Sequence, residues 1–334
     1  MEQRKEIVNR YVQLGLTVSK AVALADLSKS SYYYQPNGKR KGKAPSKSTM
    51  LNGRLIENSV VVSRIQDLAG EEFIDYGYRR ISKKLRKEGY RINKKKVYRL
   101  MKENKLVSVS KPVPKGQPRT FVRYSAPRHV HPFATIELDI KYVYLSVERN
   151  NAYLLTALDT FTRIAIEWEL NDSMKNTDVI SLLKRLMQNP LLKPYQGRIV
   201  FFIRTDNGPQ FIANALREAI ICLGLNHEFI HPGTPQENAH IESFHSTLQK
   251  IVIDQYDLPD LIAAKTVLNA FYHTYNNKRI MESILDCSPI EFLKMWEEGK
   301  VEIREHKRKQ KFFFRERQAI ADPALSREDF TWVH

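Results

Sequence analysis

The sequence is poor in cysteine, and its first third lacks the usual zinc ligands. Only Cys222 and Cys287 occur among 334 residues, which excludes a framework of several disulfides and is typical of a reducing compartment. No His or Cys precedes His129, so a zinc module near the N-terminus is excluded. No apolar run approaches the roughly 18 residues that span a bilayer, and the charged opening MEQRKE leads into no signal segment. We therefore expect a soluble protein of the cytoplasm.

Acidic residues are scarce in the first part of the chain. Residues 1–130 contain 30 Lys and Arg against 10 Asp and Glu, a net charge of +20, whereas the remaining residues contain 24 and 27, a net charge of −3. A cationic excess of this size usually indicates a polyanionic partner, most often nucleic acid. We expect the front of the chain to bind DNA, and the acids gathered behind it need a different explanation.

Two segments precede the main body of the chain. Residues 1–35 are predicted to form a small helix-turn-helix-like unit, with a plain three-helix cap as the alternative. Its helices are expected over 2–14, 17–26 and 28–34. Residues 36–51 combine Gly, Pro, Ser and basic residues without an apolar period, which predicts a flexible basic linker.

Residues 52–107 are predicted to form a larger helix-turn-helix DNA-binding domain of three helices. The first is marked by Leu55, Ile56, Val60, Ile65 and Leu68. The second, YGYRRISKKLRKEGY, ends at Gly89. In the third, NKKKVYRLMKENKL, Asn93 is a good N-cap and an apolar stripe recurs at helical spacing, at Val97, Leu100 and Met101.

The polar faces of the second and third helices are basic. Basic side chains on the first turns of the last helix suit entry into a major groove, and a solvated charged face is the alternative. The candidate DNA contacts on these helices are Arg79, Arg80, Lys83, Lys94, Lys95, Lys96, Arg99 and Lys102.

From residue 133 the pattern changes to strands, after a Pro-rich basic connector at 108–132. ATIELDIKYVYLSV, NAYLLTALDTF and RIAIEWEL predict three strands in a meander. The elements expected next are a helix over 177–188, a strand over 198–205, a helix over 210–223, a strand over 226–230 and a helix from near Pro235. This order predicts an α/β domain with a mixed five-stranded sheet and flanking helices at 133–256, followed by a helical block and tail at 257–334.

Three acids of this region stand out by their placement. Asp139 lies in the middle of the first strand, Asp206 ends the fourth, and Glu242 lies on the helix after HPGTPQENAH, with 66 and then 35 residues between them. Phosphodiester cleavage needs an activated nucleophile and a stabilised leaving oxygen, and two Mg²⁺ ions about 3.5–4 Å apart supply both. Carboxylate oxygens suit Mg²⁺, and three clustered carboxylates would repel one another without a cation.

Other side chains near these acids are weaker candidates. Glu137 shares a strand face with Asp139 and is the best rival ligand. Asp159 is expected to be structural or to support a ligand. Asn238 and His245 share a helix face with Glu242. Asn238 could orient that acid or contact DNA, and His245 could equally be a plain surface residue. His231 is expected to be a loop residue.

Three segments carry a resemblance to a known family. LDIKYVYL, RTDNGPQF and GTPQENAHIESFHSTLQ resemble the catalytic blocks of the DDE transposases of bacterial insertion sequences of family three, members of the retroviral-integrase superfamily. YGYRRISKKLRKEGYRINKKKVYRLMKENKL resembles that family's helix-turn-helix segment, and FYHTYNNKRI with SPIEFL resembles its C-terminal helical block. The resemblance covers residues 54 to 295. It implies a ribonuclease-H-like catalytic core behind all-α helix-turn-helix modules.

The resemblance also implies an activity. Asp139, Asp206 and Glu242 would be the catalytic residues and the ligands of two Mg²⁺ ions, with Mn²⁺ as a substitute. The protein would bind the terminal inverted repeats of a mobile element, nick them by hydrolysis and join the freed 3′-OH to target DNA. It would act as a homo-oligomer in a synaptic complex on the nucleoid. The alternatives are an inactive or regulatory DNA-binding protein derived from a transposase, and a plain Mg²⁺-dependent nuclease of the same fold.

The chain departs from the family pattern at two positions. Ile136 stands where the family usually has Trp, and Gln249 stands where it usually has a basic residue seven positions after the catalytic Glu. Lys250 comes next, but on a regular helix it lies about 80° away from the face of Glu242. Lys250 and Asn238 complete the candidate DNA contacts.

Overall fold

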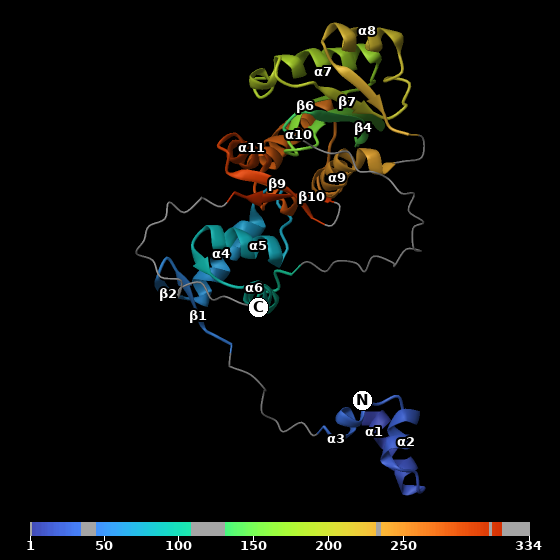
Figure 1. The fold of residues 1–334 in the computed structure, drawn as a ribbon, viewed down its shortest axis with the longest axis vertical. Coiled ribbons are helices and arrows are strands. Elements are labelled where there is room, and N and C mark those ends of the chain that lie inside the picture. The colour runs from blue at the N-terminus through green and yellow to red at the C-terminus, as the bar shows by residue number, and fades with distance from the viewer. Residues whose placement is uncertain (1, 35–44, 108–130, 232–234, 307–308, 316–334) are drawn as a thin grey trace. The chain divides into compact units, whose positions relative to one another are not determined.

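The structure is a computed structural model that describes residues 2–34, 45–107, 131–231, 235–306 and 309–315 (Figure 1). It comprises two compact units, Met1–Lys47 and Ser48–His334. The predicted connector at 108–132 lies almost entirely outside the described residues. No helix in the described part of the chain is long and apolar enough to cross a membrane.

The first unit contains the three helices that the sequence predicts. They are α1 (Glu2–Gln13), α2 (Val18–Leu24) and α3 (Lys29–Tyr33). Ser28 caps α3 by accepting a hydrogen bond from the backbone N of Ser31 at 3.1 Å. The core of this unit is small and consists of Val8, Ala21 and Val22 with partly buried neighbours.

The second unit begins with a helical domain that carries a small sheet. Its helices are α4 (Asn58–Gly70), α5 (Tyr78–Lys87) and α6 (Lys94–Glu103), and its strands are β1 (Ser48–Leu51), β2 (Arg54–Glu57) and β3 (Tyr90–Arg91). The strands pair antiparallel in the order β2-β1-β3. The second and third helices confirm the sequence prediction. In α6, the side chain of Asn93 accepts from the backbone N of Lys96 at 2.8 Å.

Two sequence predictions are wrong at the start of this unit. The linker was predicted through residue 51, but β1 occupies its last residues, and Leu55 and Ile56 lie on β2 rather than on the first helix. The cause is the pair Asn52-Gly53, which closes a two-residue hairpin with positive φ at both positions, 46° and 83°. Asn-Gly is the usual pair for such a turn. The front of the chain is therefore not purely α-helical.

The catalytic domain has a five-stranded mixed sheet in the order β6-β5-β4-β7-β8, as the sequence predicts. The strands are β4 (Thr135–Leu145), β5 (Asn150–Asp159), β6 (Ala165–Asn171), β7 (Phe202–Thr205) and β8 (Asn226–Phe229). The first three form an antiparallel meander. β7 runs parallel to β4 and β8 runs parallel to β7. This is a ribonuclease-H-like core.

Helices cover both faces of this sheet (Figure 1). α7 (Asn176–Gln188) and α8 (Asn214–Cys222) pack with Ile136 and Leu138 of β4. α9 (Ala239–Leu248) and α10 (Leu261–Asn277) pack with Val143 and Leu145 of the same strand. Since successive side chains alternate across a strand, the odd-numbered residues of β4 face α9. A 3₁₀ turn, η2 (Pro235–Asn238), precedes α9, and a π-helical turn, η3 (Gln249–Ile253), follows it.

The C-terminal block is not helical throughout, so the sequence prediction is wrong there in part. After η4 (Glu282–Ile284) and α11 (Pro289–Glu297), the strands β9 (Val301–His306) and β10 (Lys309–Phe314) form an antiparallel hairpin. The hairpin is anchored by Phe312, whose ring packs edge-on against Phe161 and Phe292. Strands are favoured where one face of the pleated backbone is buried, and the packing of Phe312 on these two rings buries one face of the hairpin.

The helix-turn-helix-like domain shares its packing with the catalytic domain. Phe73 stacks on Tyr256 and meets Phe271 edge-on, within the core under α9 and α10. Conversely, Ile280 is buried among the residues of α4, α5 and α6. The sequence treats these segments as separate domains, whereas the structure joins them in one unit.

Candidate active site

Asp139 lies on the face of β4 that α9 covers. Its Oδ1 accepts from the backbone N of Ile140 at 2.8 Å, and its Oδ2 lies 3.2 Å from Nδ1 of His245. Its side chain is 27% exposed. The strand therefore presents this carboxylate at a partly open surface, beside the helix that carries Glu242.

Glu242 shares a hollow of about 520 Å³ with Asp139. The pKa of its carboxyl is raised, first by burial and then by the negative charges of Asp139 and Glu137, against a smaller lowering by His245. A carboxylate whose ionisation is disfavoured by burial and by a neighbouring negative charge is a group that a bound cation would stabilise. Carboxylate oxygens facing one hollow are the donor set that Mg²⁺ prefers, so this pair fits a divalent cation.

Asp206 follows the last residue of β7 and is less directly placed. The parallel pairing of β4 and β7 sets Glu137 opposite Arg204, and Asp206 follows two residues later, just beyond the end of β7. However, Asp206 does not line the hollow, and its Oδ1 accepts from the backbone N of Gly208 at 2.9 Å. Among the described residues no group of three or more His, Cys, Asp or Glu side chains is placed to hold a metal.

Gly208 leaves room for the carboxylate of Asp206 to fold back on its own turn. A Cβ atom at this position would lie 2.9 Å from Oδ1 of Asp206, closer than such atoms approach in folded proteins. The Asp-Asn-Gly sequence thus lets the carboxylate fold back on its own turn at the end of β7. The structure brings Asp139 and Glu242 together in one hollow, whereas Asp206 lies outside the residues that line it.

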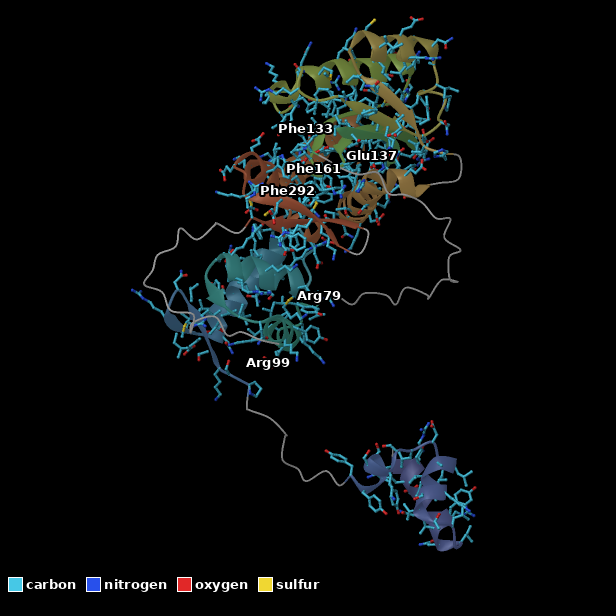
Figure 2. The ribbon with its side chains drawn as sticks, viewed as in Figure 1. Arg79, Arg99, Phe133, Glu137, Phe161 and Phe292 are labelled. Atoms are coloured by element: carbon cyan, nitrogen blue, oxygen red, sulfur yellow. The ribbon has the colours of Figure 1, made fainter. Side chains whose placement is uncertain are left out.

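Glu137, the rival ligand, is fully buried and engaged. It accepts from Nδ1 of His240 at 3.0 Å and from the backbone N of Ile241 at 2.8 Å, and Nη1 of Arg204 lies 3.7 Å away. The backbone N–H groups of the first helical turn have no partner within a helix, so the carboxylate satisfies one of them. Glu137 fixes the start of α9 to β4 (Figure 2).

His245 and Asn238 are buried, at 6% and 4% exposure, rather than on the surface. His245 places Nδ1 against Asp139, and its buried Nε2 has no partner in the described part of the chain; the same holds for Oδ1 of Asn238. Helical spacing put both residues on the face of Glu242, but burial depends on strands far away in the sequence. His231 is exposed in its loop, as predicted, and contacts Glu237 at 2.9 Å.

Lys250 is 68% exposed but forms an ion pair within the protein. Its Nζ lies 2.6 Å from Oδ2 of Asp75, in the helix-turn-helix-like domain, while Nε2 of Gln249 donates to Asp254 at 2.7 Å. Both residues lie in the π-helical turn after α9, so the regular-helix angle expected for Lys250 does not apply. As a candidate DNA contact, Lys250 is already occupied by an ion pair.

The candidate DNA contacts on α5 and α6 fall into two groups. Lys83 is held by Asp286 at 2.7 Å, Arg80 lies 4.0 Å from Asp75, Lys96 donates to the backbone O of Ser48, and Arg99 lies 3.2 Å from Glu103. The exposed ones are Arg79, Lys94, Lys95 and Lys102. Figure 2 labels Arg79 on α5 and Arg99 on α6.

Asp159 has a structural role, which is one of the two roles that the sequence predicted for it. It is fully buried, and its carboxylate accepts from the backbone N atoms of Phe133, Phe161 and Thr162 at 3.0, 3.3 and 2.8 Å, and from the hydroxyl of Thr162 at 2.6 Å. Burial raises its pKa against the opposite effect of these hydrogen bonds. Asp159 closes the loop between β5 and β6.

Comparison with family models gives matches along most of the second unit. An HTH-like domain matches residues 59–113, and models of the integrase core domain match residues 129–235 and 223–289. The first two overlap the helical domain and the sheet described above.

Individual proteins are also similar. An uncharacterized protein of insertion element IS476 from Xanthomonas euvesicatoria is 27% identical over 87% of this chain and 77% of its own length. The transposase for insertion sequence element IS904 from Lactococcus lactis is 25% identical over 72% of this chain and 95% of its own. The HTLV-2 integrase catalytic core domain, solved in complex with magnesium, is 19% identical over 49% of this chain and 99% of its own, with a TM-score of 0.39.

Proposed function

We propose that this chain is a DDE transposase of the insertion-sequence type, as its similarity to integrase core and HTH-like domains supports, and that it nicks the ends of a mobile DNA element and joins the freed 3′-OH to a second strand. The observation that carries the proposal is the hollow shared by Asp139 and Glu242, where burial and then the charge of Asp139 raise the pKa of Glu242. Such a pair at a partly open surface is suited to a divalent cation and a phosphate.

We assign the catalytic and ligand roles to Asp139, Asp206 and Glu242. Asp206 would join the other two by turning its carboxylate away from the backbone N of Gly208, from which its Oδ1 accepts a hydrogen bond. Mg²⁺, or Mn²⁺ in its place, would activate the attacking oxygen and stabilise the leaving one when two ions are bound.

The remaining residues of the site hold these acids in position. Glu137 ties the start of α9 to β4 and so sets the distance between Glu242 and Asp139. His245 contacts the Oδ2 atom of Asp139 and limits the rotation of that carboxylate. A catalytic group must be held close to its productive geometry, and both contacts serve that purpose.

The proposed partner is double-stranded DNA, both the terminal repeats of the element and the target. The exposed Arg79, Lys94, Lys95 and Lys102 would provide contacts from the helix-turn-helix-like domain. Since two element ends must be held at once, we propose a homo-oligomer as the active form.

The test is Asp206→Asn, measured as Mg²⁺-dependent nicking of duplex DNA from the chromosomal locus of the element. We expect cleavage to be abolished and DNA affinity to be retained or slightly raised, because one repulsive charge is removed. Asp254→Asn is the matched control, since Asp254 lines the same hollow and has no proposed catalytic role. Substantial cleavage by Asp206→Asn would overturn the assignment.

Strand-transfer products separate this proposal from its alternatives. A plain nuclease would leave nicked ends without joined molecules, and a regulatory protein would bind without cleaving. The same reaction, resolved on a denaturing gel, distinguishes all three.

A further inference from the structure

A second hollow, of about 390 Å³, lies on the other side of the catalytic helix. On α9, Glu242, His245 and Ser246 line the first hollow, whereas His240, Ser243 and Thr247 line this one. At 100° per residue these two sets lie on opposite faces of α9. The other walls come from α5, the loop between β5 and β6, and the segment from α10 to η4.

Three arginines from distant parts of the sequence line this second hollow: Arg80, Arg163 and Arg279. Its one acidic lining residue, Glu282, is 82% exposed and lies 3.8 Å from Lys83. Burial raises the pKa of the Tyr275 hydroxyl, while Arg163 and Arg279 both act to lower it. The two guanidinium groups therefore both act on one phenol. Since Arg279 and Arg80 also lie 2.7 and 4.0 Å from Asp75, the cationic excess of the hollow comes mainly from Arg163.

Arg279 has an unsatisfied donor in this wall. Its side chain is 7% exposed, and its Nη2 donates to Oδ1 of Asp75 at 2.7 Å. Its Nη1 is buried without an acceptor in the part of the chain that the structure describes. A buried guanidinium N–H without an acceptor costs free energy, which a bound anion would recover.

Arg163 is placed by an uncommon backbone conformation. Its φ is 68°, in the left-handed region that residues other than glycine rarely adopt, at the end of the loop that Asp159 closes. Burial lowers the pKa of its guanidinium. Backbone conformations of this kind concentrate at functional positions. Arg163 also lines an adjoining hollow of about 460 Å³, which adds Lys311.

We propose that the arginine hollow behind α9 binds a phosphate of the DNA backbone. The planar guanidinium group matches a phosphate with two parallel hydrogen bonds, and the exposed Ser243 offers a hydroxyl to the same ligand. Because the cationic surface continues into the adjoining hollow, it suits a phosphate that belongs to a polymer. The inference rests on DNA as the proposed partner, but it adds a contact that no catalytic step uses.

The first test uses the full chain and a duplex of about 30 base pairs of arbitrary sequence, with affinity measured from about 50 to 200 mM salt. Each phosphate contact on duplex DNA contributes about 0.9 to the slope of log affinity against log salt. We expect Arg163→Gln to lower the slope by about that amount and Arg163→Lys to restore it. Arg217→Gln, an exposed arginine of α8, is the matched control and should leave the slope unchanged. An unchanged slope for Arg163→Gln would overturn the proposal.

The second test places a probe in the hollow. Ser243→Cys, in a Cys222→Ser background that removes the exposed cysteine, is labelled with a photoactivatable group and irradiated with the same duplex. We expect a crosslink to DNA that the label at Arg217→Cys does not give. If inorganic phosphate raises the melting temperature through Arg163 but no crosslink forms, the hollow takes free phosphate and the proposal for DNA fails.

The two proposals fail separately. A chain that cleaves DNA with Mg²⁺ but shows neither the slope change nor the crosslink keeps the proposed function and loses the phosphate site. A chain whose binding and crosslinking behave as expected, but which never cleaves in the presence of Mg²⁺, keeps the phosphate site and loses the proposed activity.

Discussion

Asp75 is the acid on which three basic residues of the second unit converge, so its removal has a large expected effect. Nη2 of Arg279 and Nζ of Lys250 lie 2.7 and 2.6 Å from its carboxylate, and Nη1 of Arg80 lies 4.0 Å away. Arg279 is 7% exposed and Asp75 is 25% exposed, whereas Lys250 is 68% exposed. The Arg279 pair is therefore the one that matters energetically.

We expect Asp75→Asn to lower the free energy of unfolding by about 2–3 kcal/mol. Removing one partner of a fully buried ion pair costs about 3–5 kcal/mol, and we reduce that figure because Asp75 is partly open to solvent. The exposed Lys250 pair adds at most about 0.5 kcal/mol. For a unit of this size the change corresponds to a fall in melting temperature of about 4–12 °C.

The measurement is urea unfolding of the full chain, followed by tryptophan fluorescence, with Lys250→Met as the control. Burial acts to raise the pKa of Asp75, but Arg279 and Lys250 outweigh it and the pKa lies below its usual 3.8. The stabilisation is therefore present above pH 3.8 and is lost as the pH falls through the lowered pKa, where wild type and variant should converge. If Asp75→Asn costs no more than Lys250→Met at neutral pH, the reasoning is refuted.

Three further predictions concern the front of the chain. A protein that begins at Ser48 should melt within about 2 °C of the full chain, because residues 1–47 have a core of their own; a larger fall in its calorimetric melting temperature would contradict this. Asn93→Ala should lower the free energy of unfolding by about 1 kcal/mol through loss of the α6 cap, against no change for Lys95→Ala, in urea titrations. Arg99→Ala should cost about 1–3 kcal/mol of binding free energy on the cognate element end and relax the preference at one base pair, because Arg99 is expected to contact a base. Lys95→Ala should weaken binding to cognate and scrambled DNA equally. If Arg99→Ala also lowers both affinities equally, Arg99 contacts a phosphate instead.

The catalytic sheet was predictable because its signals are local. Alternation in β4, β5 and β6 and the turn chemistry at Asp206 depend on neighbouring residues, and the order of strands and helices limits the topology. The small sheet at β1 and β2 was also signalled locally, by Asn52-Gly53, but the basic composition around it masked the hairpin. Composition indicated a linker where turn chemistry indicated two strands.

The parts of the site that sequence could not predict depend on contacts between distant segments. His245 is buried because Asp139 lies beside it, 106 residues earlier in the chain, and Lys250 is occupied because Asp75 lies beside it, 175 residues away. Helical spacing predicts which face of the helix a side chain lies on, but it does not predict which distant segment packs against that face. The π-helical turn after α9 adds a second difficulty, since it changes that spacing at Gln249 and Lys250.

The ion pairs within the second unit change what the charge of the chain means for DNA binding. Lys83 and Lys87 pair with Asp286 and Glu291 and so hold the helix-turn-helix-like domain against the C-terminal block. Lys250 pairs with Asp75 and holds the same domain against the turn after α9. The net charge read from the sequence counts these lysines as if they were available to bind DNA. A lysine or arginine that is paired with an acid of the protein does not neutralise a DNA phosphate and so releases no counterion. The slope of log affinity against log salt should therefore correspond to fewer phosphate contacts than the net charge suggests. The exposed lysines of α6 and the arginine hollow behind α9 are the places where cationic groups exceed the acids beside them.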